Sequence, residues 1–494
     1  MRIALVSREL VTSPHSGLSR ATRDLARGLH DVGHDVHVIA ELAGDAGRAG
    51  LPEGVRVQDI SGGRPLTWAA AAHGALARLH GESQLDVASV PLWGSPGLFT
   101  TRDPRFPTVV SCMTSAATIG EIDAAWLEGP GGREALRMER ACIQGARHLH
   151  GLTRSALDKT IGDYGGDPLT AGVVARGLRD RAAGSLREAG QAGDGPLEVL
   201  FVGRLEPRKG VDVLLDAMRA LVAEGADVRL TLAGPDAELS GGGTYRERFE
   251  AASAGEIVGE RVSFAGAVSD DRLHELYARA DVVCQPSRYE SHGIVLIEAM
   301  MFGRPIVTTS GGGIPEVVEP DGNALLAAPG DPTSLARCLR AMLESPPLRD
   351  RMGHRSRELY ATRFEIGVVA RDMTALFETA ARAHAETPVE PSAASMLAVA
   401  LDERAAAAER RLRTWQTCAR DLEADRDAQR ARAEAAEAQR DACEERCSDA
   451  ERERDDWRTQ TEVVNGRLFQ VMTSRTWRYT QPLRDAARVT RTRW

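Results

Sequence analysis

The sequence lacks the features that mark membrane-spanning, disulfide-bonded and nucleic-acid-binding proteins. No window of the 494 residues approaches about 18 uninterrupted apolar residues, so no transmembrane helix is expected. The seven cysteines are odd in number and show no paired C-x-x-C spacing, which argues against disulfides and structural zinc. The formal net charge is -9, which argues against nucleic acid as the main partner because that affinity normally needs a large basic surface.

We expect no export signal at the start of the chain. Residues 2–10, RIALVSREL, resemble a short strand, without the apolar stretch and the small-residue cleavage site of a signal peptide. We therefore expect a protein that is made and kept in the cytoplasm.

Apolar runs alternate with amphipathic stretches from the N-terminus onward. A strand over 3–7 is followed by helical spacing over 19–34, a glycine where that helix would end (Gly33), and a strand over 35–40. Strand, helix, strand is the βαβ pattern of a parallel sheet. Further strands are expected over residues 85–90 and 107–113. The pattern predicts a Rossmann-like, doubly wound domain over residues 1–180.

A second alternation of the same kind follows a linker rich in Gly, Ala and charge over residues 181–195. It predicts a second Rossmann-like domain over 196–365, then a helix over 366–385 that returns to the first domain. The expected fold class is therefore α/β, with two doubly wound domains in series and a cleft between them. In such sheets ligands bind beyond the carboxyl ends of the strands. Strands are expected over residues 197–203, 228–234, 261–266, 281–287 and 305–310, and helices over 211–225 and 271–280.

The C-terminal part of the chain has a different composition. After a Pro- and Ser-containing linker over 386–398, Ala, Arg, Glu and Asp dominate, and small or apolar residues recur at alternate spacings of four and three. This heptad pattern predicts a long α-helical coiled coil over 399–472. Two interpretations stay open: a solvated single helix, and a coiled coil that joins a second copy or a partner enzyme. The seam is interrupted at Arg426, Arg440 and Arg454.

Two acids seven residues apart stand in the segment RYESHGIVLIEAM. Glu290 precedes the expected helix and Glu298 falls in its second turn, with Gly293 at the start. A helix that begins at Gly293 directs the free N–H groups of Gly293, Ile294 and Val295 toward the interdomain cleft, where they can bind a phosphate. One acid can then face what is bound before the helix, and the other what lies beside it.

A second motif, FVGRLEPRKG, places two cations on a loop between a strand and a helix. Arg204 follows the strand end and Lys209 precedes the helix. Two such cations can bind a diphosphate and stabilise the negative charge that develops when it departs. Each could also be an ordinary surface cation, but their occurrence beside Gly293 and the two acids favours a site.

These motifs together resemble the retaining GT-B glycosyltransferases of family 4, over residues 1–385. The residues that carry the resemblance are the Glu-x7-Glu segment and the loop Gly203, Arg204, Lys209 and Gly210. The resemblance implies a GT-B fold with a nucleotide-sugar donor in the cleft. It further implies that Arg204 and Lys209 contact the donor diphosphate, Glu298 the ribose hydroxyls and Glu290 the transferred sugar.

The same resemblance covers part of the first domain and includes one departure. SGLSR is similar to the family's glycine loop, so Gly17 would let the backbone approach the donor phosphate. Many relatives have a histidine before the threonine that ends the strand at PTVVSCMT, where it touches the sugar; here Met113 precedes Thr114. No D-x-D motif is evident in the two domains, so we expect neither a metal ion nor a cofactor. The resemblance also implies that the configuration at the anomeric carbon is retained without a protein nucleophile.

The expected function is transfer of a sugar to a lipid-linked or growing cell-surface polysaccharide, such as O-antigen. One alternative is a non-catalytic GT-B scaffold that has lost its chemistry at Met113 and organises other enzymes through the coiled coil. Another is a GT-B sugar-nucleotide epimerase, which would not need the C-terminal extension. The intact residues Arg204, Lys209, Glu290 and Glu298 favour catalysis.

The last residues, 473–494, form a basic segment in an acidic protein, with several arginines interleaved with Trp477, Tyr479 and Trp494. Arginine attracts anionic lipid and tryptophan settles at the headgroup boundary. We therefore expect a peripheral position on the inner face of the plasma membrane. A basic tail that packs on the acidic body or on a partner protein is the alternative.

Overall fold

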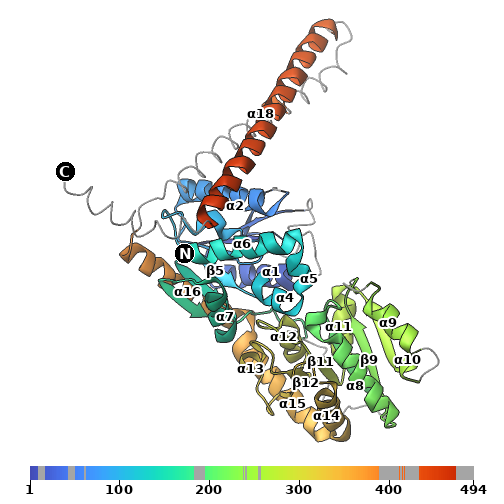
Figure 1. The fold of residues 1–494 in the computed structure, drawn as a ribbon. Coiled ribbons are helices and arrows are strands. Elements are labelled where there is room, and N and C mark those ends of the chain that lie inside the picture. Colours follow the sequence, from blue (N-terminus) through green and yellow to red (C-terminus); the bar gives the residue numbers. More distant parts are fainter. Residues whose placement is uncertain are drawn as a thin grey trace.

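The computed structural model contains two parallel β-sheets, each with helices on both faces, and a long C-terminal helix (Figure 1). Most of the predicted linkers over 181–195 and 386–398, the first half of the predicted coiled coil, and the predicted tail beyond Thr473 lie outside the described residues. The structure describes residues 1–8, 17–42, 51–60, 63–182, 195–236, 238–239, 242–253, 257–388, 411, 414–415, 417 and 433–473.

The first sheet has seven strands in the order β3-β2-β1-β4-β5-β6-β7. In the middle of the sheet, Ile3 pairs with Val36 on one side and with Val87 on the other. The strand order reverses beside β1, so the loops after β1 and β4 diverge at the carboxyl edge of the sheet. The strands are β1 (Arg2–Ser7), β2 (Asp35–Ala40), β3 (Arg56–Asp59), β4 (Val87–Pro91), β5 (Thr108–Cys112), β6 (His148–Gly151) and β7 (Thr170–Val173).

The second sheet has six strands in the order β10-β9-β8-β11-β12-β13, with the same reversal, here beside β8. All of its pairings are parallel, and its central strands are buried on both faces. The prediction of two Rossmann-like parallel-sheet domains is therefore confirmed. The strands are β8 (Leu197–Val202), β9 (Val228–Ala233), β10 (Val262–Gly266), β11 (Val282–Gln285), β12 (Ile306–Thr309) and β13 (Ala324–Ala327).

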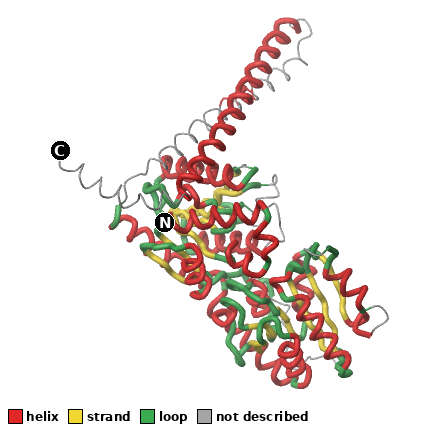
Figure 2. The backbone as a smooth tube through the Cα atoms, in the orientation of Figure 1, coloured by secondary structure: helices red, strands yellow, loops and turns green. Residues whose placement is uncertain are grey.

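Helices pack on both faces of each sheet and bury four main apolar clusters. The alternation of red helices and yellow strands in Figure 2 follows the βαβ pattern expected from the sequence. In the first domain lie α1 (Gly17–Asp31), α2 (Pro65–Ser83), α3 (Gly97–Thr100), α4 (Ala116–Ile122), α5 (Ala124–Glu128), α6 (Pro130–Gly145) and α7 (Arg154–Tyr164). In the second lie η2 (Pro207–Lys209), α8 (Val211–Ala223), α9 (Tyr245–Ala252), α10 (Ile257–Arg261), α11 (Asp270–Arg279), α12 (Ile294–Met301), α13 (Ile314–Val317), α14 (Pro332–Glu344), α15 (Pro346–Leu359) and η3 (Tyr360–Phe364).

The last helix of the α/β part, α16 (Ile366–Glu386), crosses back to the first sheet. Its buried residues Val369, Met373 and Phe377 join the same apolar cluster as Ile3 and Leu5 of β1. The chain thus passes between the two domains twice, once after β7 and once before α16.

A C-terminal coiled coil is not evident among the described residues, which give instead one long helix, α18 (Ala433–Thr473), that projects from the first domain (Figure 1). The heptad positions of α18 are its less exposed stripe, with Cys443 and Ala450 buried. Its neighbour comes from the same chain: the Cys443 thiol donates to the Trp415 carbonyl at 3.5 Å, and Arg411 pairs with Glu453 at 3.5 Å.

The two segments run antiparallel at these contacts: Arg411 lies against Glu453, and Trp415, later in the chain, lies against the earlier Cys443. The continuous coiled coil expected over 399–472 therefore stays a prediction, since most of its first half lies outside the described residues. Heptad spacing specifies which face of a helix is covered but not which segment covers it. No helix in the described part of the chain has both the length and the apolar composition needed to cross a bilayer.

Candidate active site

The loop between β11 and α12 carries the first acid of the motif. Gly293 caps α12 with a φ of +80°, a conformation that glycine adopts at little cost. Glu290 lies three residues earlier and is held by a backbone bridge to Gly312. The N–H groups of Ile294 and Val295 belong to the first turn, where a helix offers no internal partner. The loop thus presents a carboxylate and a helix N-terminus side by side.

Glu290 is buried between two cations of the second domain. One carboxylate oxygen accepts a hydrogen bond from the Lys209 ammonium, and the other lies 3.1 Å from Nη1 of Arg208. Burial alone would raise the pKa of Glu290, but the charges of Lys209 and Arg208 outweigh it and lower this pKa to about 2. Glu290 is therefore ionised throughout the physiological range.

The loop after β8 brings those cations to the site through an unusual backbone. Gly210 follows Lys209 with a φ of +67°, and a Cβ added there would lie 2.1 Å from the carbonyl oxygen of Pro286. Only glycine lets this loop pack so closely on the β11–α12 loop. Arg204 lies on the same loop, but its side chain is 68% exposed and its Nη2 lies 3.2 Å from Glu206.

Glu298 lies on α12 and is bound from two directions. Its Oε1 accepts a hydrogen bond from Nη1 of Arg20 at 2.9 Å, and its Oε2 accepts one from the hydroxyl of Tyr277 at 2.7 Å. Arg20 belongs to α1 of the first domain, so this buried ion pair joins the two domains. The charge of Glu298 raises the pKa of Arg20, even though burial acts in the opposite direction.

Two hydroxyl side chains from the first sheet complete the junction. Thr114, just after β5, donates to the Ser291 hydroxyl at 3.1 Å, and Thr153, just after β6, donates to the Ser291 carbonyl at 2.8 Å. Ser291 is the neighbour of Glu290. The carboxyl edge of the first sheet therefore contacts the loop that carries the acid.

This arrangement matches known proteins over both domains. The family model described as glycosyl transferase 4-like domain matches residues 16–177, and the one described as glycosyl transferases group 1 matches residues 184–359. A D-inositol 3-phosphate glycosyltransferase of Streptomyces bingchenggensis is 30% identical over 321 residues, which cover 62% of this chain and 69% of that protein. The chain belongs to the GT-B glycosyltransferases.

Other relatives of this glycosyltransferase extend over more of its length. A glycogen synthase of Mycobacterium tuberculosis is 28% identical and covers 77% of this chain and 95% of its own. Among solved structures, a sucrose-phosphate synthase of Thermosynechococcus elongatus superposes with a TM-score of 0.62 at 22% identity, over 77% of this chain and 98% of that one. HepE of Anabaena, solved with UDP and glucose, gives a TM-score of 0.59 at 20% identity, over 77% and 100%.

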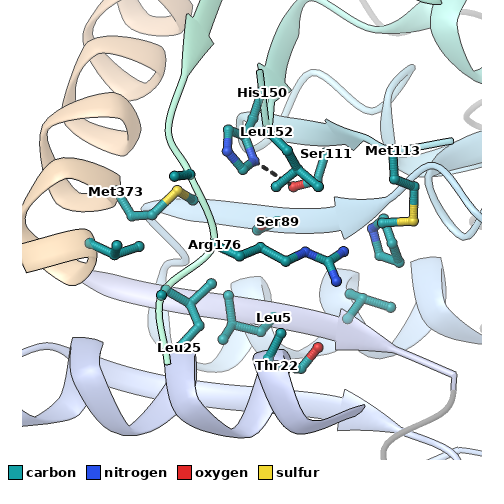
Figure 3. Close-up of a pocket in the computed structure, with 16 residues that line it drawn as sticks. Leu5, Thr22, Leu25, Ser89, Ser111, Met113, His150, Leu152, Arg176 and Met373 are labelled. Carbon is teal, nitrogen blue, oxygen red and sulfur yellow. Dashed lines mark hydrogen bonds between the residues drawn. The ribbon is translucent and has the colours of Figure 1, made fainter. Parts of the chain in front are cut away.

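The structure brings together some of the residues expected from the sequence of this glycosyltransferase and separates others. Lys209 and Glu290 are in direct contact, and Gly203, which follows β8 with a φ of +144°, lies close to Lys209. Gly17 is the first residue of α1, the helix that carries Arg20. Met113 instead lines a pocket inside the first domain (Figure 3). The expected pair of Arg204 and Lys209 differs in environment, since one is exposed and the other buried.

Sequence reasoning missed the residues that hold the two acids. Arg208 was overlooked although it stands directly before Lys209, and its position in PRKG could have drawn attention to it. Arg20 and Tyr277 contact Glu298 from separate elements, so no local spacing indicates them. His292 is buried next to Ser291, and its Nδ1 has no hydrogen-bond partner among the described residues. In that part of the chain, no group of three or more His, Cys, Asp or Glu could hold a metal ion.

Proposed function

We propose that this glycosyltransferase transfers a sugar from a nucleotide-sugar donor, with retention and without a metal ion, to a lipid-linked or growing cell-surface polysaccharide. The observation that carries the proposal is the cluster of Arg208, Lys209 and Glu290 at the N-terminus of α12. The structure of HepE with UDP-glucose supports a nucleotide-sugar donor for a protein of this fold.

The cluster has the charge that a diphosphate needs. Counting Arg204 and Glu206, three cations stand against two carboxylates, which leaves one net positive charge beside the first-turn N–H groups of α12. Guanidinium, ammonium and backbone amides are the groups that bind phosphate oxygens in proteins. The same groups stabilise the negative charge that develops as the diphosphate departs.

Glu298 has hydrogen-bonding capacity left for the donor's ribose. A carboxylate can accept about four hydrogen bonds, and Arg20 and Tyr277 supply two. The remaining lone pairs can accept hydrogen bonds from two ribose hydroxyls. Because Arg20 comes from the first domain, ribose binding at Glu298 would also depend on the position of one domain relative to the other.

The acidity of Glu290 limits what it can do in the reaction. With a pKa of about 2 it is a weak base at neutral pH, so it is unsuited to removing the acceptor proton. It can accept hydrogen bonds from the transferred sugar and stabilise positive charge near the anomeric carbon. The departing diphosphate then takes the acceptor proton, and the protein aligns the two substrates.

The alternative of a non-catalytic scaffold rests on Met113. Its thioether cannot donate the hydrogen bond that a histidine would give to the sugar, and it lies in the pocket of the first domain. A scaffold of this kind would bind the donor and leave it intact. Release of nucleoside diphosphate from the bound donor would separate the two, because a scaffold leaves the donor intact and a transferase does not.

A thermal-shift panel of UDP-, GDP-, ADP- and dTDP-sugars, in the presence of EDTA, tests donor binding directly. A ligand that binds only the folded protein raises Tm by mass action. At a ligand concentration of 100 times Kd, it adds about 2.7 kcal/mol to the free energy of unfolding. We expect one nucleotide class to raise Tm in EDTA. A panel in which no nucleotide sugar shifts Tm, with or without added Mg²⁺ or Mn²⁺, would contradict the proposal.

Two further parts of the proposal concern partners. We propose that the C-terminal region joins a second copy or a partner enzyme through the heptad stripe of α18, and that the basic tail over 473–494 holds the enzyme on anionic membrane. The stripe supports the first part, because Trp457 on it is only partly covered in the single chain. The composition of the tail supports the second.

A further inference from the structure

The two segments that cross between the domains are hydrogen-bonded to each other. Leu178, after β7, donates its N–H to the Phe364 carbonyl at 3.0 Å, and its own carbonyl accepts from the Ile366 N–H at 3.1 Å. The Tyr360 hydroxyl donates to the same Leu178 carbonyl at 2.9 Å. The second segment includes η3, a π-helical turn, a rare form that recurs at functional sites. Residues 175–178 and 360–366 thus form one crossing element between the domains.

His292, in the β11–α12 loop, contacts both segments of the crossing element. Its Nε2 accepts a hydrogen bond from the backbone N–H of Arg176 at 3.3 Å. Its ring packs edge-on against Phe364, with the ring centroids 6.2 Å apart and the planes at 77°. The side chain is only 2% exposed, and burial, together with the charge of Arg176, lowers the pKa of His292 to about 3. The imidazole is therefore neutral at physiological pH, with Nε2 as the acceptor.

The β11–α12 loop is packed closely around Glu290. Ser291, between Glu290 and His292, is bound by two hydroxyls of the first domain. The Gly313 N–H donates to the Glu290 carbonyl at 2.7 Å, and a Cβ added at Gly313 would lie 2.5 Å from the Ser291 carbonyl oxygen. Closely packed segments transmit a displacement rather than absorb it. A movement at His292 is therefore passed to Glu290 and to Gly293 at the start of α12.

We propose that His292 is a positioning residue that couples the crossing element to the loop carrying Glu290, so that the arrangement of the domains and the placement of this carboxylate change together. The inference rests on the proposed function, because placing Glu290 affects turnover only if a sugar is transferred. A backbone N–H that loses its partner away from water is unfavourable, so the Arg176 N–H and His292 should move as one unit. His292 acts through Glu290 and needs no contact with the substrate.

Three substitutions separate the hydrogen bond from the ring contact and from general stability. His292→Gln puts an amide oxygen near the position of Nε2, so it keeps an acceptor and loses the ring. His292→Phe keeps a ring against Phe364 and removes the acceptor. His80→Phe is the matched control. His80, on α2, also accepts a backbone N–H, from Leu85 at 3.1 Å, and its ring also contacts a phenylalanine, Phe106, with centroids 5.3 Å apart, but all within the first domain.

Steady-state kinetics of the full chain in EDTA give the first test. His292→Phe should lower kcat by about tenfold or more, because a misplaced reacting group is costly. The donor KM should change by less than about threefold, since the groups expected to bind the diphosphate all stay in the second domain. His292→Gln should recover most of the lost kcat. His80→Phe should keep the wild-type kcat, although it loses the same kinds of contact.

Hydrogen–deuterium exchange gives a test that a merely stabilising contact would fail. The probe is the diphosphate, UDP, GDP, ADP or dTDP, of the nucleotide sugar that raises Tm. In the wild type and in His80→Phe it should slow exchange over residues 288–293 and also over 175–178; in His292→Phe it should slow only the first range. If His292→Phe does not fold, His292→Asn replaces it, because its shorter amide cannot reach the Arg176 N–H.

The outcomes separate this inference from the proposed function. Wild-type kcat in folded His292→Phe, equal losses of kcat in His292→Phe and His80→Phe, or nucleotide protection that reaches 175–178 without His292 would each overturn the inference alone, because nucleotide-sugar turnover by the wild type would stand. Absence of any nucleotide-sugar binding or turnover in the wild type would refute the proposed function, and this inference with it.

Discussion

At the scale of single residues, the proposed function assigns Lys209 and Glu298 to different parts of the donor, so their loss should have different kinetic effects. Lys209→Ala removes a cation beside the departing diphosphate and should lower kcat by roughly 100- to 1000-fold, equivalent to about 2.7–4 kcal/mol. Glu298→Ala removes the acceptor of the ribose hydroxyls, so the donor KM should rise as well. Steady-state kinetics on the donor identified in the thermal-shift panel measure both.

The control for this pair is Arg229→Ala, which removes an exposed cation whose Nη1 lies 3.9 Å from Glu198, near the amino ends of β8 and β9 and away from their carboxyl ends. It should leave kcat and KM unchanged, since exposed ion pairs contribute little. Wild-type kinetics in both Lys209→Ala and Glu298→Ala would remove this site from consideration.

Glu139 gives a prediction about stability and pH. It is buried on α6, and one of its oxygens accepts hydrogen bonds from the Ala116 N–H at 2.8 Å and the Tyr164 hydroxyl at 2.7 Å. Burial raises the pKa of Glu139 to about 7, against an ordinary value of 4.5. A raised pKa means that its contribution to stability is full below pH 4.5 and is lost as the pH rises through 7.

Glu139→Gln cannot ionise, so it should remove this loss. Relative to the wild type, the fall in unfolding free energy between pH 5 and pH 8 should shrink by roughly 2 to 3 kcal/mol. Urea denaturation at the two pH values measures it. Glu134→Gln, on the exposed side of the same helix, is the matched control. An unchanged pH dependence in Glu139→Gln would show that this carboxyl stays ionised in the folded protein.

The site residues that could be predicted from the sequence are those fixed by local spacing. Glu290, Gly293 and Glu298 share one loop and helix, so their order and the helical period placed them. The partners Arg20 and Tyr277 could not be predicted, because tertiary packing brings α1 and α11 to Glu298 from 278 and 21 residues away.

At the scale of elements, the glycine that follows Lys209 decides how the β8–α8 loop packs. Gly210→Ala combines a positive φ with a clash against the Pro286 carbonyl, whereas Gly225→Ala has a φ of +84° and no atom within 4 Å of the added Cβ. Gly225→Ala should therefore cost about 1–2 kcal/mol from backbone strain alone. Gly210→Ala should cost more and also lower kcat, because the loop must move Lys209 away from Glu290.

Urea denaturation and donor turnover of the two variants make the comparison. The strain is common to both glycines, so the difference between the variants reports the close packing at Gly210. Equal losses of stability, with turnover unaffected in both, would mean that the loop is free to shift and does not position Lys209.

The elements themselves were predictable to different degrees. Apolar runs identified β1 and β2 and helical spacing identified α1, and Gly33, with a φ of +95°, lies just after the end of α1 as its position indicated. The four-residue strands β3, β6, β7 and β13 were not identified, because so few residues show no period; the equally short β11 and β12 were found because they lie in longer expected segments. The heptad pattern located the covered face of α18 but could not reveal that Trp415 of the same chain lies against it.

At the scale of the whole molecule, contacts between the domains meet at the site itself. Arg20 bridges to Glu298, Thr114 to Ser291, and Arg181 to Asp24 at 2.7 Å. Domain interfaces of this kind permit relative motion. If Glu298 binds the donor as proposed, donor binding should depend on how the first domain approaches the second, because Arg20 of the first domain pairs with Glu298.

The basic tail yields a prediction for the complete chain. The full-length protein should float with liposomes that contain anionic lipid, and binding should weaken as salt screens the arginines. Deletion of residues 467–494 should abolish flotation while leaving donor turnover unchanged. Liposomes of neutral lipid are the control for the charge dependence. Equal flotation of the full-length and truncated proteins would show that the tail is not the membrane contact.

The most direct test of the account is release of nucleoside diphosphate from the matching nucleotide sugar in EDTA, compared between the wild type and Lys209→Ala. The account predicts turnover by the wild type without any divalent ion, and a loss of at least about 100-fold in Lys209→Ala, because that lysine stabilises the leaving diphosphate. Turnover that appears only when Mg²⁺ or Mn²⁺ is added, or that survives unchanged in Lys209→Ala, would contradict it.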